Sequence, residues 1–430
     1  MPREMKESGI EWIGKIPCNW SIKRTKNCFS NHKDVVGNAV DDYQRLALTL
    51  NGVIKRDKDD VNGLQPEKFT GYQILKENEL VFKLIDLKNI STSRVGLSTY
   101  TGIVSPAYIV LSPNGNINTK YAEYFYLSLW QREIFNHMGD DGVRSSLNSN
   151  DLLNIPITYP SITEQQKIAN FLDEKVGEID KVIAKTKDSI EEYHNLEKAI
   201  IQEAVTKGLD SNYSLVDSGV KYIGLIPENR DVKRVKYIAS SILKGNGITK
   251  DEVIKNGNIQ CIRYGEIYTK YKTKILETIS RTNYEQISSP KQIEKGDILC
   301  AATGELVEEI GKNVVYMGDD KCLAGGDIII VKHNQNPEYL NYALNSIGSQ
   351  EQKSLGKTKL KVIHISASEI GDIKVALPSL IEQQEIVDYL NEKRKEIELL
   401  IENKSKIISD LEKYKKSLIY EYVTGKKVVL

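Results

Sequence analysis

The sequence predicts an α+β protein in which two globular α/β domains are separated by two long helices, and these helices form an antiparallel intramolecular coiled coil. Three observations predict this architecture. Two short motifs occur twice in the same order, the segments between them differ, and a long stretch with heptad spacing follows the second motif in both copies. We therefore expect an internal repeat with pseudo-two-fold symmetry.

The first motif opens each half of the chain. Residues 8–17 read SGIEWIGKIP and return 210 positions later as SGVKYIGLIP at residues 218–227. The same offset carries Lys23-Arg24-x-Lys26 onto Lys233-Arg234-x-Lys236. The second motif, PSITEQQ at residues 160–166, returns as PSLIEQQ at residues 378–384. A duplicated frame around two divergent segments implies one scaffold that carries two different recognition surfaces.

Between the repeated motifs, each half shows the pattern of a mixed α/β domain. Short apolar runs broken by turn residues predict strands at 45–50, 79–82 and 107–111 in the first domain and at 259–264, 296–300 and 326–331 in the second. Asn51-Gly52 directly after the first run is a strong turn signal. Helical spacing of apolar residues predicts one helix over 120–138 and another over 337–346.

A heptad seam follows each Glu-Gln-Gln. Its apolar positions, which we expect to pair the helices and to support subunit docking, are Leu172, Val176, Ile179, Ile183 and Ile190 in the first copy and Leu390, Ile397, Ile401, Ile408 and Leu411 in the second. Polar residues interrupt the seam at Thr186, Glu197, Arg394, Lys404 and Lys415. Each helix would run for about 45 residues, or about 65 Å. Such a helix pairs either with an external partner or with the other copy, and the repeat favours the second arrangement.

These patterns divide the chain into five parts. The predicted parts are a first domain over 1–159, a first spacer helix over 160–207, a linker over 208–219, a second domain over 220–377 and a second spacer helix over 378–430.

Composition bounds the function. The chain has 59 Lys+Arg against 59 Asp+Glu, so any site for a polyanion must come from local clustering rather than from net charge. The first residues are charged where a signal peptide is apolar, and no apolar run approaches the length of a membrane span. We expect a cytoplasmic protein without membrane contact. The five cysteines and five histidines lack the spacing of disulfide frameworks or metal sites, so no metal is predicted.

No motif predicts catalysis. Gly356-Lys357-Thr358 resembles the end of a phosphate-binding loop, but Glu351 stands where that loop requires glycine. Gly245-Asn246-Gly247 lacks the third glycine of a dinucleotide-binding fingerprint. No nucleophile elbow and no loop for a flipped adenine is present in the sequence. We therefore assign no catalytic residue and no cofactor to this chain.

Local positive charge marks the candidate DNA contacts. The candidates are Arg144, Ser145, Lys270, Tyr271, Lys272, Lys353, Lys357, Lys359 and Lys361. Interleaved tyrosine and lysine at 268–274 suits phosphate contacts and base stacking, but the same pattern also fits an edge strand protected by lysine. The lysines just before the second long helix favour phosphate contacts.

The Trp12–Pro17 opening, the Ile155–Ile168 junction, their second copies and the heptad helices together resemble the specificity subunit of type I restriction-modification systems. Gly296-Asp297 before a strand also resembles the target recognition domains of that family, whereas the first domain has Glu77-Asn78 in the equivalent place. The resemblance covers nearly the whole chain.

The resemblance implies a DNA-binding subunit of host defence without catalytic activity of its own. Two target recognition domains would each read one half of a split, asymmetric target in double-stranded DNA. The helices would set their spacing and dock two modification subunits, which bring S-adenosylmethionine and methylate adenine. Restriction subunits, translocase-nucleases that use ATP and Mg²⁺, would join that assembly.

Three alternatives remain open at the level of sequence. The chain could be a coiled-coil interaction protein that does not bind DNA, with its neutral net charge as the main support. It could be an enzyme, which the missing motifs disfavour. Within the DNA-binding reading, it could serve a methylase-nuclease fusion rather than a three-subunit system.

Overall fold

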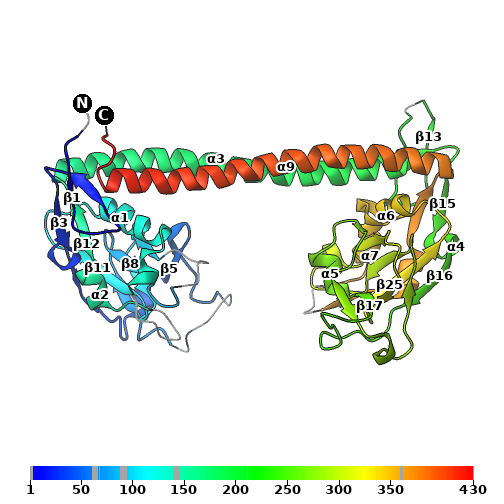
Figure 1. The fold of residues 1–430 in the computed structure, drawn as a ribbon, viewed down its shortest axis with the longest axis horizontal. Coiled ribbons are helices and arrows are strands. Elements are labelled where there is room, and N and C mark those ends of the chain that lie inside the picture. The colour runs from blue at the N-terminus through cyan, green and yellow to red at the C-terminus, as the bar shows by residue number, and fades with distance from the viewer. Residues whose placement is uncertain are drawn as a thin grey trace. The chain divides into compact units, whose positions relative to one another are not determined.

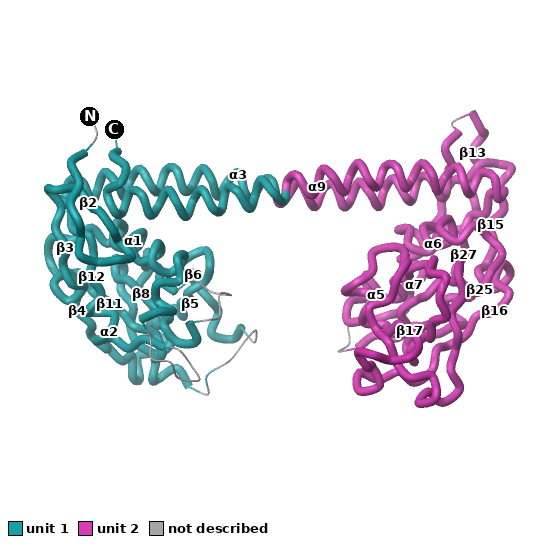
Figure 2. Tube along the Cα trace, in the orientation of Figure 1, with its two compact units in different colours: residues 1–186, 405–430 teal, residues 187–404 magenta. Residues whose placement is uncertain are grey.

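The computed structural model describes residues 3–60, 66, 68–87, 94–138, 146–210, 212–358 and 362–429. The chain forms two compact units, residues 1–186 with 405–430 and residues 187–404 (Figure 2). Each unit contains one mixed α/β domain and part of both long helices (Figure 1). The predicted fold class, two mixed α/β domains with a pair of long antiparallel helices, is confirmed.

The domain of unit 1 is built on antiparallel strands. Its four-stranded sheet has the order β4 (Phe29–Asn31), β11 (Ile109–Pro113), β8 (Leu80–Phe82) and β9 (Val95–Leu97). Four two-stranded pairs complete it, namely β1 (Met5–Glu7) with β2 (Lys15–Pro17), β3 (Ser21–Arg24) with β12 (Pro156–Tyr159), β5 (Leu46–Thr49) with β6 (Gly52–Lys55), and β7 (Gln73–Leu75) with β10 (Gly102–Val104).

Three predicted strands of this domain correspond to β5, β8 and β11. The turn at Asn51-Gly52 joins β5 to β6, and Gly52 takes a φ of +87° that glycine adopts without steric cost. The domain contains helices α1 (Thr119–Gln131) and α2 (Ser149–Asn154). The predicted helix over 120–138 is longer than the observed helix α1, which ends at Gln131. The chain leaves the α-helix before Glu133, which has a left-handed φ of +59°, and continues as a 3₁₀ turn, Ile134–His137.

The domain of unit 2 is built on a five-stranded sheet and a four-stranded sheet. Its five-stranded sheet has the order β16 (Ala239–Lys244), β25 (Ile328–His333), β21 (Ile298–Ala301), β23 (Asn313–Tyr316) and β18 (Lys274–Ile275). Its four-stranded sheet has the order β19 (Ser280–Thr282), β17 (Ile259–Ile262), β24 (Cys322–Ala324) and β20 (Gln292–Ile293). The β18/β23 and β17/β24 pairs are parallel, which distinguishes these sheets from the sheet of unit 1.

Shorter elements complete unit 2. They are the strand pairs β13 (Leu215–Asp217) with β14 (Leu225–Pro227), β15 (Asp231–Arg234) with β27 (Lys374–Leu377) and β22 (Thr303–Gly304) with β26 (Ile363–His364), and the helices α4 (Val235–Ile238), α5 (Tyr264–Thr269), α6 (Pro337–Asn345), α7 (Ile347–Ser354) and α8 (Ala367–Asp372). The strands expected near 259, 298 and 328 are β17, β21 and β25, and the helix expected over 337–346 is α6. Asn336 caps α6 and Pro337 occupies its first turn, the residue types that helix starts prefer.

The two long helices are α3 (Ile162–Lys207, 46 residues) and α9 (Leu380–Val423, 44 residues). Ser161 and Ser379 precede them, and their hydroxyl oxygens accept the N–H groups of Glu164 and Glu382 at 3.3 Å. Gly208 follows α3 with a φ of +80°, the left-handed conformation in which many helices end.

The long helices pack antiparallel in each unit. In unit 1 the Phe171 and Tyr422 rings lie 4.5 Å apart, and Lys415 bonds Asp180 at 2.5 Å. In unit 2 the Lys404 ammonium lies 5.7 Å from the Tyr193 ring centroid, and Arg394 pairs with Glu197 at 3.2 Å. Rising numbers on α3 therefore meet falling numbers on α9.

The apolar seam residues take part in the cores of the units. Leu172, Ile179 and Ile183 are buried in the main core of unit 1, where Val176, Ile408 and Leu411 pack against them. Leu390 belongs to a core of unit 2, Ile397 is 5% exposed, and Ile190 and Ile401 are half-buried. Each domain core thus includes side chains of the long helices. The helix pair without the domain, or the domain without the helices, would leave these side chains exposed.

Candidate nucleic-acid interface

The repeated glutamines join the first domain to the start of α3. Gln165 is fully buried, and its amide nitrogen donates to the Pro160 carbonyl at 2.9 Å. Its side-chain oxygen accepts the N–H of Asn118 at 2.9 Å, while the Asn118 amide donates to Gln166 at 2.6 Å. Asn118 in turn caps α1 by accepting the N–H of Tyr121. One short motif therefore locks α1 against the long helix.

The second copy repeats these contacts. Gln383 donates to Pro378 and accepts the N–H of Asn336, both at 2.9 Å, and the Asn336 amide donates to Gln384 at 2.8 Å. Asn336 caps α6 through the N–H of Tyr339. The repeated Glu-Gln-Gln motif is therefore structural, because the side-chain amides of both glutamines in each copy form hydrogen bonds within the chain.

In each unit, one tyrosine of the domain bonds the C-terminal end of the long helix that begins in the other unit. The Tyr121 hydroxyl donates to Val423 near the end of α9 at 3.0 Å, and the Tyr339 hydroxyl donates to Val205 near the end of α3 at 3.3 Å. Burial raises the pKa of both phenols, so each remains a donor. Each domain is thus bound to the beginning of one helix and the end of the other.

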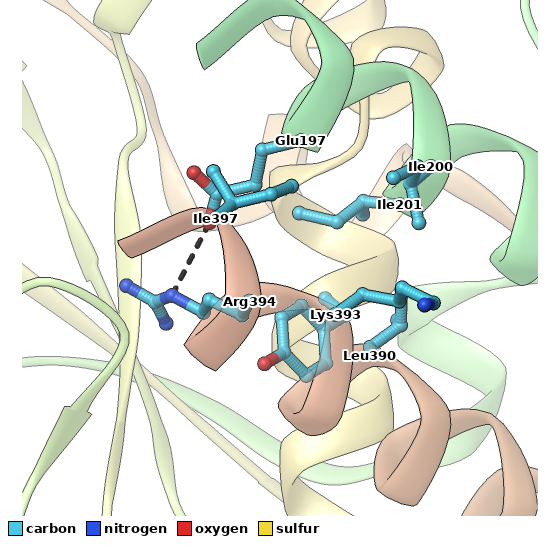
Figure 3. A pocket seen from close by; sticks show the side chains of 8 residues that line it. Glu197, Ile200, Ile201, Leu390, Lys393, Arg394 and Ile397 are labelled. Atoms are coloured by element: carbon cyan, nitrogen blue, oxygen red, sulfur yellow. Dashed lines mark ion pairs between the residues drawn. The ribbon is translucent and has the colours of Figure 1, made fainter. Parts of the chain in front are cut away.

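The seam of unit 2 contains a half-buried ion pair that Figure 3 shows. Arg394 of α9 points toward Glu197 of α3, beside Ile201, Leu390 and Ile397. The cavity at this place measures about 10 Å³, room for no more than one water molecule. It is therefore a packing defect around a polar pair rather than a ligand site.

Lys353 corrects one of the sequence-based predictions. Its side chain is buried at 2% exposure, and the ammonium donates to Gly311 O at 2.7 Å, Asn313 Oδ1 at 2.9 Å and Leu344 O at 2.7 Å. An ammonium has three hydrogens, so none is left for a phosphate. The lysine stabilises the domain core, and the prediction that it contacts DNA is wrong.

The tyrosine and lysine cluster lies beside α5 and the start of β18. Lys270 is exposed and has no ion pair among the described residues. Lys272 pairs with Glu398 of α9 at 3.0 Å. The Tyr271 hydroxyl accepts the N–H of Ile279 at 3.2 Å, and burial is the main cause that raises its pKa to about 12. Among the described residues, Lys270 thus has no intramolecular partner, whereas Lys272 and Tyr271 each have one.

Of the five remaining candidates for DNA contact, the structure describes one, Lys357. Lys357 is half-buried and forms an ion pair with Glu369. Arg144, Ser145, Lys359 and Lys361 lie outside the described residues.

Sequence reasoning missed a polar groove on the four-stranded sheet of unit 2. It has a volume of about 450 Å³ and is lined by Asn258, Ile259, Gln260, Arg281, Tyr284, Glu285, Asp320 and Lys321. Gln260 accepts the Thr278 hydroxyl at 3.0 Å and donates to Asp320 at 2.6 Å, while Asn258 donates to Glu285 at 3.0 Å. These amides are held in fixed orientations at the surface. The lining residues come from β17 and its start, from β19 and the turn after it, and from the loop before β24, so no spacing in the sequence marks the groove.

Catalytic chemistry finds no support in the described side chains. They contain no cluster of three or more His, Cys, Asp or Glu that could hold a metal ion. The five cysteines are free thiols, four buried and Cys18 exposed. Burial raises the pKa of Cys300 to about 11 and of Cys261 to about 12, which opposes a reactive thiolate.

Comparison with known proteins identifies the family of the repeated domains. A family described as type I restriction modification DNA specificity domain matches residues 10–200 and again residues 227–410. The chain belongs to this family. The two matches coincide with the two copies of the internal repeat, so each half is one specificity domain.

Individual relatives agree along the whole chain. The specificity subunit of the MjaVIII type I restriction enzyme of Methanocaldococcus jannaschii is 24% identical over 370 residues, covering 84% of this chain and 81% of its own. A chain solved for work on complex assembly and conformational transition of the type I R-M system covers 96% of this chain and 99% of its own, with a TM-score of 0.69 and 14% identity. The HsdS subunit of Thermoanaerobacter tengcongensis gives a TM-score of 0.51 at 13% identity and covers 98% and 100%.

The protein is thus a DNA target-specificity subunit of a type I restriction-modification system, a non-catalytic component of that assembly. Membership of this family excludes two alternatives that the sequence left open, an enzyme and a coiled-coil interaction protein that does not bind DNA. Among the described helices, none is both long and apolar enough for a membrane span.

Proposed function

We propose that the specificity subunit reads a bipartite, asymmetric target in double-stranded DNA, with one half-site for each unit. One observation carries this proposal: the junctions are the same in both units, whereas the sheets differ. Gln165 and Gln383 make the same bonds to a proline carbonyl and to the N–H of the asparagine that caps the next helix, but unit 1 has an antiparallel four-stranded sheet and unit 2 has two sheets with parallel pairs. Matching junctions that carry different sheets favour two half-sites of different DNA sequence.

The polar groove of unit 2 is the proposed base-reading surface of that unit. Arginine bonds guanine, and glutamine or asparagine bonds adenine, through two hydrogen bonds in the major groove. Arg281, Gln260 and Asn258 line this groove together with the exposed Lys321. The fixed orientations of the two amides lower the entropy that base recognition would cost.

Phosphate contacts position the domain around these bases. Lys270 is the candidate with the clearest support, since it is exposed and lacks an ion pair among the described residues. Lys272, Tyr271 and Lys357 remain proposed contacts of a weaker kind, because each already has a partner in the chain. Arg144, Ser145, Lys359 and Lys361 also remain proposed contacts.

Partner subunits supply the chemistry in this proposal. Two modification subunits would dock on the long helices and bring S-adenosylmethionine for adenine methylation, and restriction subunits would bring ATP-driven translocation and Mg²⁺-dependent cleavage. A stripe of exposed apolar residues on α9 in unit 1, formed by Ile407 and Tyr414 at seven-residue spacing, supports a docked helix. Since DNA is the substrate, the assembly would act in the cytoplasm of a prokaryotic cell.

Exchange of one domain tests the proposal. Residues 12–159 are replaced by those of another specificity subunit, the chain is produced with its modification subunits, and the methylated adenines are mapped. We expect one half of the target to change and the other half and its methylation to stay. If both halves stay the same, unit 1 does not read a half-site.

A further inference from the structure

The basic motif that occurs twice, Lys23-Arg24-x-Lys26 and Lys233-Arg234-x-Lys236, begins on the equivalent strand in both units and ends in the helical turn that follows it, Thr25–Asn27 in unit 1 and α4 in unit 2. In unit 1, β3 pairs with β12 so that Lys23 faces Ile157, and in unit 2, β15 pairs with β27 so that Lys233 faces Val375. The two sites are therefore equivalent in backbone structure. Nothing in the junction or in the proposed base-reading groove uses these cations.

In unit 1 two of these cations meet on a neutral oxygen. Arg24 Nη1 and Lys26 Nζ each donate to Asn154 Oδ1 at 3.2 Å. The Asn154 amide nitrogen donates to the Asn150 carbonyl at 2.9 Å, which fixes the oxygen toward the cations. Arg24 and Lys26 are exposed, and neither has a carboxylate within ion-pair distance among the described residues. Two positive groups thus converge on one neutral oxygen.

In unit 2 the same place holds a carboxylate. Arg234 Nη1 and Lys236 Nζ donate to Asp372 Oδ1 at 3.3 and 2.7 Å, the same atoms and the same acceptor position as in unit 1. The hydrogen bond from Lys236 is the main cause that lowers the pKa of Asp372, so this carboxyl is ionised at neutral pH. The two sites differ at this acceptor only by the exchange of an amide nitrogen for an oxygen.

A second position shows the same difference. Lys233 pairs with Asp231 at 3.1 Å, whereas Ser21 stands in the equivalent position of β3. Lys23 instead lies 3.5 Å from the centroid of the Tyr159 ring. Unit 2 has one further cation in this region, Lys374 in place of Pro156, but each of its three motif cations has a carboxylate partner. The three motif cations of unit 2 therefore share two carboxylates, whereas those of unit 1 have no carboxylate partner among the described residues.

We propose that Arg24 and Lys26, with Lys23 beside them, bind a backbone phosphate of the target DNA in unit 1, and that Asp372 occupies the equivalent phosphate position in unit 2. This inference rests on the proposed function. A phosphate would supply the negative charge that Asn154 lacks, and a guanidinium next to an ammonium matches its oxygens. The cations project from a target recognition domain rather than from the long helices, which favours DNA over an acidic protein partner.

Exchange of the acceptors tests the inference without a change of shape. Asn154→Asp gives unit 1 the carboxylate of unit 2, and Asp372→Asn is the reverse exchange. The complex with its modification subunits is titrated with target duplex between 50 and 200 mM salt. We expect Asn154→Asp to weaken binding about three- to tenfold at the lower salt concentration and to reduce the slope of log affinity against log salt by about one. Asp372→Asn should not weaken binding.

The cations themselves provide the matched control. The double variant Arg24→Gln with Lys26→Gln should lose affinity at least as strongly as Asn154→Asp, whereas Arg234→Gln with Lys236→Gln should stay within about twofold of the parent complex. The methylated sequence should not change, because phosphate contacts carry no base information.

Two results would overturn the inference. One is an unchanged affinity and salt slope for both variants of the unit 1 site. The other is a weaker DNA affinity that arises from loss of the modification subunits, which would assign the cations to an acidic protein surface. Failure of the proposed function is recognised separately, since the parent complex would then not methylate a bipartite site.

Discussion

At the scale of single residues, the same side chain serves different purposes according to its burial. Lys353 and Lys270 are both lysines in a region rich in positive charge, yet one is in the core and the other is at the surface. Nothing in the neighbouring sequence separates them. The difference arises because Gly311 and Asn313, 42 and 40 residues before Lys353, and Leu344, 9 residues before it, place three acceptors around its ammonium.

Lys353→Met is expected to destabilise unit 2 by about 3 kcal/mol, because three buried acceptors would lose their donor. The effect should depend on pH. Burial lowers the pKa of Lys353 to about 8, below its usual value of 10.5, so between these values the unfolded chain binds more protons than the folded one. The free energy of unfolding of the parent protein, relative to the variant, should therefore rise with pH from about 8 to about 10.5.

Denaturant unfolding of both proteins across that pH range measures this prediction. Lys270→Met serves as the control, since an exposed lysine without an ion pair among the described residues should change stability by less than about 0.5 kcal/mol. A difference between parent and Lys353→Met that stays constant with pH would contradict the assignment.

At the scale of elements, polar residues in the helix seam specify the register of α3 and α9. Two interruptions of the heptad pattern, Glu197 and Arg394, pair with each other, and a third, Lys415, pairs with Asp180. A shift along the helices would leave these charges in an apolar seam without partners, which is costly. The seam itself explains the pairing, and its polar members explain why only one alignment is stable.

Charge reversal tests this explanation. Glu197→Arg alone should destabilise the protein by about 2 kcal/mol because it places two cations together in a seam where Arg394 is 15% exposed. The double variant Glu197→Arg with Arg394→Glu should recover part of this loss. The pair Asp180 and Lys415 is the comparison: Asp180 is 51% exposed, so the same reversal there should cost less, about 0.5 kcal/mol. Chemical unfolding measures all four proteins, and equal losses at both pairs would contradict the role of burial.

At the scale of the whole molecule, each domain is complete only with both long helices. Tyr121 binds the end of α9 and Tyr339 binds the end of α3, while the glutamine motifs bind the opposite ends. A partner that occupies the outer face of the helices would therefore act on a surface distinct from both domain cores.

The stripe on α9 gives a prediction at this scale. Ile407→Glu with Tyr414→Glu should abolish or strongly weaken association with the modification subunits, because charges would be buried against a docked helix. The change should leave stability nearly unchanged, since these side chains are 49% and 53% exposed. Leu276→Glu, at 64% exposure on the domain of unit 2, is the matched control. Size-exclusion chromatography of the co-produced subunits measures assembly, and full assembly of the double variant would exclude this face.

The sequence by itself determined the frame of this protein. The two repeated motifs, the heptad spacing and the missing catalytic motifs were enough for the fold class, the antiparallel helices and the family, because these properties depend on local order and period. One helix end was wrong, at Glu133, where a left-handed backbone outweighs helical spacing.

Only the tertiary structure decided which polar residues are free. It assigned the Glu-Gln-Gln motif to the junction, moved Lys353 into the core, brought Asn258, Gln260 and Arg281 into one groove, and set Asn154 against Asp372. The physical reason is that burial and charge compensation depend on neighbours from distant parts of the chain. Two copies of one motif can therefore have the same sequence and a different electrostatic environment.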